Sequence, residues 1–129
     1  MIVEFENIKR KKTQDFICDI LYFGKEQLFP RHKNIFINIK RVYNQGTVGD
    51  VFEYDDREFH MRYDGTLSPT EIVTTLLHEM VHVKQYLRNE MPDTFGYKTM
   101  KEYYNQPHEK EAYTKEEILT EEYYADKRL

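Results

Sequence analysis

The stretch "TTLLHEMVHVKQYL", residues 74–87, places two histidines and a glutamate inside an otherwise apolar run. Ionisable groups buried among Leu, Met and Val are costly unless something compensates for their lost hydration, and a bound metal ion is one such compensation. The preceding "SPTE" has Ser68 at the N-cap, Pro69 at the first helical position and Glu71 at the third, which is a capping box. We therefore predict a helix over residues 69–89 that carries all three ionisable side chains.

Two further helices are predicted, one on each side of this segment. Residues 13–29 repeat apolar side chains at helical spacing, with Thr13 as the cap and Pro30 as the stop. Pro107 opens a last helix that continues toward the C-terminus. Between the second and third helices, "MPDTFGYK" (91–98) predicts a loop from its Pro, Asp and Gly, and residues 99–105 predict a short helical turn.

Alternating patterns predict strands between the first two helices. In "NIFINIKRVY" (34–43), Ile35, Ile37 and Ile39 lie on one side of an alternating pattern, which is typical of a half-buried strand. The segment "VFEYDDREFHMRYD" (51–64) predicts two strands around an Asp55-Asp56 turn. We expect a three-stranded antiparallel meander, and hence an α+β fold with an N-terminal helix, this sheet, a central helix and a C-terminal helix.

Length and composition bound the class of protein. The 129 residues suit one domain, residues 1–129, and 40% hydrophobic residues are enough for it to fold. A net charge of −4 offers no overall field for nucleic acid, which we do not expect as a partner. Neither a signal peptide nor a membrane-length apolar run is recognisable, and the single cysteine, Cys18, suits a reducing compartment. We expect no membrane association and a soluble, cytoplasmic protein, in the host cytoplasm if the chain is phage-encoded.

The central helix carries the pattern His-Glu-x-x-His at His78, Glu79 and His82. Residues four apart project from one face of a helix, so both imidazoles can reach a single ion. Gln85 falls on the same stripe. Glu79 projects about a quarter turn away, as suits a general base that takes a proton from water activated by the metal. The alternative is a pair of histidines satisfied by hydrogen bonds on a partly exposed face.

A catalytic zinc site has three protein ligands and an open position, so a third ligand is needed. In "QPHEKEAY" (106–113), Glu109 shares a stripe with the inward-facing residues of the last helix, which favours it. Glu111 points elsewhere and His108 lies at the edge of the inner face, and both stay open as alternatives. Tyr113, one turn beyond Glu109, is expected either to pack or to hydrogen-bond a reacting oxygen. The ligand set indicates Zn²⁺.

Together, "LLHEMVHVKQY" (76–86) and "PHEKEAY" (107–113) resemble the SprT-like and phage metallopeptidases of the zincin class. The resemblance spans residues 13–125 and implies a minimal zincin-like fold that hydrolyses peptide bonds. It implies His78 and His82 as zinc ligands, Glu79 as base and Glu109 as third ligand in the gluzincin manner. It also implies an edge strand that holds an extended substrate, for which "REFHMRY" (57–63) is the candidate. Tyr113 departs from the Asp that many gluzincins have one turn after the third ligand.

Three functions follow from these patterns. The first is a zinc metallopeptidase acting on a peptide or protein substrate, with Glu79 as the base. The second is a non-catalytic zinc-binding module that holds a protein partner, in which both Glu109 and His108 close the site. The third is a metal-free interaction domain. The sequence does not specify the substrate or the oligomeric state.

Overall fold

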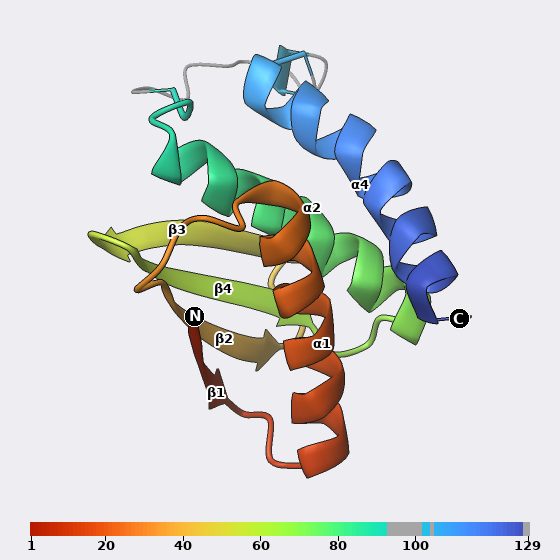
Figure 1. The fold of residues 1–129 in the computed structure, drawn as a ribbon. Coiled ribbons are helices and arrows are strands. Elements are labelled where there is room, and N and C mark those ends of the chain that lie inside the picture. The colour runs from red at the N-terminus through yellow and green to blue at the C-terminus, as the bar shows by residue number, and fades with distance from the viewer. Residues whose placement is uncertain (93–101, 104, 128–129) are drawn as a thin grey trace.

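Within the residues that the computed structural model describes, 1–92, 102–103 and 105–127, the chain forms a four-stranded sheet and three long helices. In chain order the elements are β1 (Ile2–Glu6), α1 (Lys11–Leu28), β2 (Phe36–Val42), β3 (Gly49–Asp55), β4 (Glu58–Asp64), α2 (Pro69–Leu87) and α4 (Pro107–Lys127). The helices lie together on one side of the sheet (Figure 1). The α+β class is therefore confirmed.

The sheet differs from the predicted three-stranded antiparallel meander. Its strand order is β1-β2-β4-β3, with β1 parallel to β2, β2 parallel to β4, and only β3 antiparallel to its neighbour β4. The short segment "IVEFE" forms β1, a strand that the sequence analysis missed. The predicted hairpin of β3 and β4 is present. However, its second strand, β4, pairs with β2, so β3 lies at the edge of the sheet. The prediction that "REFHMRY" is an edge strand is thus wrong, because β4 is paired on both sides; the edge strand next to α2 is β3.

The burial of alternate side chains explains which strand is central. In β4, Phe59, Met61 and Tyr63 are almost fully buried against the helices, whereas most of β3 is exposed or half-buried. A strand with large apolar residues at every inward position is stabilised most in the middle of a sheet. In β2, Ile37 and Ile39 complete this apolar face. The core therefore lies between one face of the sheet and the helices.

Helix α2 begins as its sequence predicts. Ser68 Oγ accepts a hydrogen bond from the Glu71 backbone N–H at 3.3 Å, and the Glu71 carboxylate accepts one from the Ser68 N–H at 3.0 Å. This capping box fixes where the helix starts and therefore which way His78 and His82 face. The helix ends at Leu87, two residues earlier than predicted. Pro107 opens α4 as expected, whereas α1 begins at Lys11, so that Thr13 lies inside the helix and does not cap it.

Helix α2 is surrounded by the other elements. Helix α1 approaches it closely at Gly24, where an added Cβ would lie 3.2 Å from atoms of both Leu77 and Met80. On another side α2 packs against α4 (Figure 1). Most of the predicted loop 91–98 and of the predicted helical turn 99–105 lies outside the described residues. Across the described part of the chain, no helix has the length and apolar character needed to cross a membrane.

Candidate metal centre

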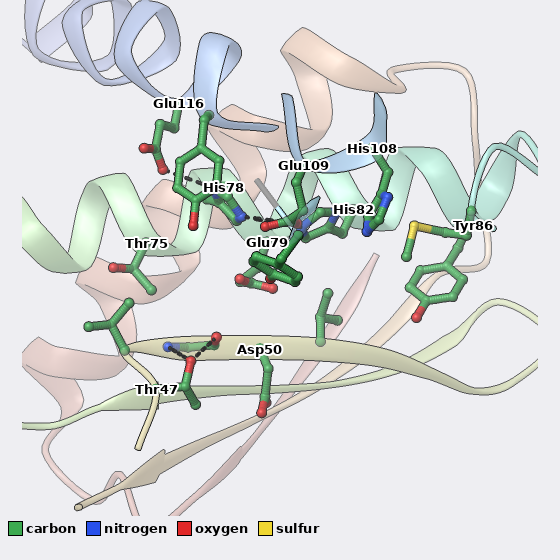
Figure 2. Close-up of a pocket in the computed structure, with 16 residues that line it drawn as sticks. Thr47, Asp50, Thr75, His78, Glu79, His82, Tyr86, His108, Glu109 and Glu116 are labelled. Carbon is green, nitrogen blue, oxygen red and sulfur yellow. Dashed lines mark hydrogen bonds and ion pairs between the residues drawn. The ribbon is translucent and has the colours of Figure 1, made fainter. Parts of the chain in front are cut away.

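His78 and His82 lie one turn apart on α2 and point into the same cleft between α2, α4 and β3 (Figure 2). Their Nε2 atoms are 3.2 Å apart, and the two residues are only 8% and 7% exposed. His78, Glu79 and His82 each offer a ligand atom within 4.8 Å of the others, so this buried group could hold a metal ion. The helical spacing of the motif therefore brings its side chains together as predicted.

Helix α4 adds Glu109 to this pair of histidines. Its Oε1 atom lies 2.5 Å from His82 Nε2 and 3.7 Å from His78 Nε2, and the residue is 1% exposed. Its other oxygen, Oε2, is buried and has no hydrogen-bond partner among the residues that the structure describes. A buried carboxylate oxygen without a donor is unfavourable unless a cation lies nearby. The carboxylate that the sequence favoured as third ligand thus lies against both imidazoles.

Each histidine uses its second ring nitrogen for a hydrogen bond that fixes its tautomer. His78 Nδ1 lies 2.9 Å from Glu116 Oε2, and His82 Nδ1 lies 2.7 Å from Gln85 Oε1. A carboxylate and an amide oxygen accept hydrogen bonds, so both Nδ1 atoms carry a proton. In the neutral rings both Nε2 atoms therefore present lone pairs to the cleft.

The resulting arrangement attracts positive charge. Two Nε2 lone pairs and a carboxylate oxygen converge on one point, and groups of this kind repel one another unless a proton or a metal ion lies between them. Burial on its own would lower the pKa of His78, but hydrogen bonds to Glu109 and Glu116 outweigh burial and raise that pKa to about 10. The pKa of Glu109 is lowered, because hydrogen bonds from the two histidines outweigh its burial. Both shifts show that the cluster favours a positive charge among its three acceptor atoms.

The donor set also fits zinc. Two nitrogens bound to one tetrahedral zinc ion at 2.0–2.1 Å lie roughly 3.3 Å apart, and the two Nε2 atoms are 3.2 Å apart. Glu109 Oε1 and His82 Nε2, at 2.5 Å, lie at the distance of a hydrogen bond and closer together than two ligands of one ion.

Glu79 lies beside this group and is 5% exposed. Burial raises its pKa to about 7, the negative charges of Glu109 and Asp50 add to that rise, and the two histidines oppose it. A carboxylate with a pKa near neutrality can both accept and return a proton. The edge strand lies close by, because a Cβ added at Gly49 would be 3.9 Å from Glu79 Cγ. Glu79 is therefore placed between the histidines and β3.

The cleft has a volume of about 330 Å³ and is open to solvent. Its floor is the start of β3, including Gly49 and Val51, and its walls are α2 and the first turns of α4. Thr47 also lines the cleft, and its hydroxyl donates to the Gly49 carbonyl at 2.9 Å and accepts from the Gly49 N–H at 3.4 Å (Figure 2). An extended ligand could therefore lie along β3 beneath the histidines.

The two other candidates for the third ligand, Glu111 and His108, differ in where they lie relative to the two histidines. Glu111 faces away from the Nε2 atoms and accepts hydrogen bonds from Gln85, Lys84 and Lys115. The ring of His108 lines the cleft, with its centroid 5.7 Å from that of His82. Tyr113 packs edge-on against His78, with ring centroids 4.7 Å apart.

Glu116 is a site residue that the sequence analysis missed. It lies two turns beyond Glu109 on α4, and this spacing of seven residues keeps it on the same helix face. It orients His78 as an acidic partner of a ligating histidine does. The helical periodicity that placed Glu109 on the inner face of α4 also places Glu116 there, so the same signal could have found it.

No protein-family model matches the chain, and searches of curated proteins and of solved structures return no match either.

Proposed function

We propose that this protein is a zinc-dependent metallopeptidase, with His78, His82 and Glu109 as the metal ligands and Glu79 as the general base. The observation that carries this proposal is the convergence of three acceptor atoms, His78 Nε2, His82 Nε2 and Glu109 Oε1, beside a buried glutamate. The likeness of the motifs to SprT-like and phage metallopeptidases belongs to the same proposal. The comparisons neither add to it nor oppose it.

When bound, zinc supplies a Lewis acid that polarises a carbonyl and makes water more acidic. The chain's own residues then handle the proton. Glu79 takes a proton from the water whose oxygen attacks the carbonyl carbon, and it passes that proton to the amine nitrogen as the C–N bond breaks. Its pKa of about 7 suits both transfers. The buried setting of Glu79 keeps other water from competing for the carboxylate.

Strand β3 is suited to hold an extended peptide. The Asp64 N–H donates to the Val48 carbonyl at 2.9 Å, so the backbone groups of Val48 face β4. In an antiparallel ladder, successive residues direct their backbone groups alternately toward the partner strand and away from it. The N–H and C=O of Gly49 and Val51 therefore point to the open edge. The Thr47 hydroxyl already hydrogen-bonds the N–H and C=O of Gly49. The backbone groups of Val51 are therefore the ones that could pair with a peptide beneath the histidines.

The alternative function is a non-catalytic zinc module in which His108 joins Glu109 and closes the site. His108 is 6% exposed, and burial lowers its pKa, which keeps the ring neutral and able to bind a metal. A closed site would have four protein ligands and would carry out no hydrolysis. X-ray absorption on the zinc-loaded protein separates the two functions by the number of imidazole ligands, which is two in the peptidase and three in the closed module.

The test of the peptidase function is Glu79→Gln, assayed with a random-sequence quenched-fluorescence peptide library. We expect hydrolysis to fall by at least a hundredfold while zinc remains bound at one equivalent. Glu117→Gln is the matched control, because Glu117 is exposed on α4 and outside the cleft. Hydrolysis that persists in Glu79→Gln would reject the assigned base. A zinc-loaded wild-type protein that cleaves nothing in the library would favour the non-catalytic module.

A further inference from the structure

Gln85 links the second histidine to α4, and each polar atom of its amide has a partner. The side chain is 1% exposed. Its Nε2 donates to the His108 carbonyl at 2.8 Å and to Glu111 Oε1 at 2.7 Å. Both partners can only accept, so the amide cannot turn over without placing oxygen against oxygen. The Gln85 Oε1 atom must therefore face His82.

Glu111 is itself held in place by two lysines. Lys84 Nζ lies 2.6 Å from Glu111 Oε2, and Lys115 Nζ lies 2.8 Å from the same atom. Lys84 is only 3% exposed, so its pairing with Glu111 is shielded from solvent. One carboxylate oxygen thus faces the lysines and the other faces Gln85. This leaves Glu111 Oε1 as a fixed acceptor for the amide.

Two acceptors compete for the single proton of a neutral His82 ring. Gln85 Oε1 lies 2.7 Å from Nδ1, and Glu109 Oε1 lies 2.5 Å from Nε2. A carboxylate is the stronger acceptor of the two. If the amide were absent or free to rotate, Glu109 would draw the proton onto Nε2. That tautomer has no lone pair facing the cleft.

We infer that Gln85, anchored by Glu111, is a positioning residue that keeps the proton of His82 on Nδ1 and so leaves Nε2 able to bind a metal ion. This inference rests on the metal site of the proposed function. It gives the first two turns of α4 two roles, since Glu109 faces the site directly and Glu111 acts through Gln85. It also gives the two histidines different partners, a carboxylate for His78 and an amide for His82.

The first test replaces the amide by an apolar side chain of similar length, Gln85→Met, with Gln27→Met on the exposed face of α1 as the control. In the metal-free wild-type protein, ¹⁵N NMR at pH values where the ring is neutral should show the His82 proton on Nδ1, and Gln85→Met should move it to Nε2. Zinc affinity, measured by competition with a chromophoric chelator, should fall about 10–100-fold in Gln85→Met and remain unchanged in the control.

The second test separates positioning from general loss of stability. Glu111→Met removes the acceptor that holds Gln85, whereas Lys115→Met removes an ion pair of Glu111 but leaves Lys84 and Gln85 in place. Only Glu111→Met should shift the His82 tautomer and reduce zinc affinity. Equal affinity in Gln85→Met and wild type, or a wild-type His82 proton on Nε2, would overturn the inference. A wild-type protein that shows the Nδ1 tautomer but takes up no zinc would instead overturn the proposed function.

Discussion

Gly49 sets how closely the edge strand can approach the motif helix, and its substitution tests that geometry. A Cβ at this position would lie 2.6 Å from Thr75 Cγ2 and 3.0 Å from the Arg62 carbonyl oxygen. The first distance is far inside van der Waals contact, so Gly49→Ala must push β3 away from α2. Such overpacking costs about 1–3 kcal/mol. For a chain of this size, that cost lowers the melting temperature by about 4–12 °C.

A second substitution, at Thr75, tests whether the steric clash is the cause of the lost stability. Thr75→Ser removes the clashing methyl group, so the double variant should recover most of the stability that Gly49→Ala loses, and the two changes should couple by at least about 1 kcal/mol. Gly46→Ala is the control, because Gly46 has a φ of +77° and nothing within 4 Å of an added Cβ. It should destabilise through its backbone, without relief from Thr75→Ser. Additive effects of Gly49→Ala and Thr75→Ser in urea unfolding would refute the proposed contact.

Three further predictions concern the metal and the charges. Zinc should stabilise the fold by about 2.7 kcal/mol at one hundred times its dissociation constant, and His78→Ala or His82→Ala should remove this shift in calorimetry. Because zinc must displace a proton from His78, whose pKa is about 10, chelator competition should show affinity falling about tenfold per pH unit from pH 8 to pH 7. The pKa of Glu111 is lowered to about 2 because its hydrogen bonds with Lys115, Lys84 and Gln85 outweigh its burial. The stability that the ionised Glu111 contributes is fully present above pH 4.5, the pKa in the unfolded chain, and is lost as the pH falls toward 2. The difference in unfolding free energy between wild type and Glu111→Met, measured in urea, should therefore disappear over that range.

Local sequence signals predicted the helices well and the sheet poorly. The "SPTE" capping box and Pro107 fix helix starts through contacts within a few residues, and both starts are as predicted. Strand pairing depends instead on contacts between distant residues, which alternation does not reveal. The predicted meander implied that β2 pairs with β3, yet β3 lies beyond β4 in the sheet. The polar character of β3, with Asp50 and Glu53, was the available sign that it belongs at an edge.

The candidate site was predictable where helix geometry alone determines it. His78, His82 and Gln85 lie on one stripe of α2, as their spacing requires. The approach of Glu109 follows from the face of α4 that packs inward, which its apolar residues indicate. The roles of Glu111 and Lys84 could not be predicted, because they depend on how far α4 is rotated against α2. That rotation is decided by packing across the whole interface.

The structure implies that the motif helix alone is not a metal site. On an isolated α2, His78 would lack its Nδ1 partner Glu116, the Gln85 amide beside His82 would lack its anchors on α4, and two ligands would bind a divalent ion weakly. Docking of α4 brings the Glu109 carboxylate, the Glu116 partner of His78 and the Glu111 anchor of Gln85 to α2 together. In the proposed zinc site, each of these contacts would favour the metal-binding state of a histidine or add a ligand, so metal binding and helix docking should stabilise one another. The last helix is therefore as much a part of the centre as the sequence motif that first pointed to it.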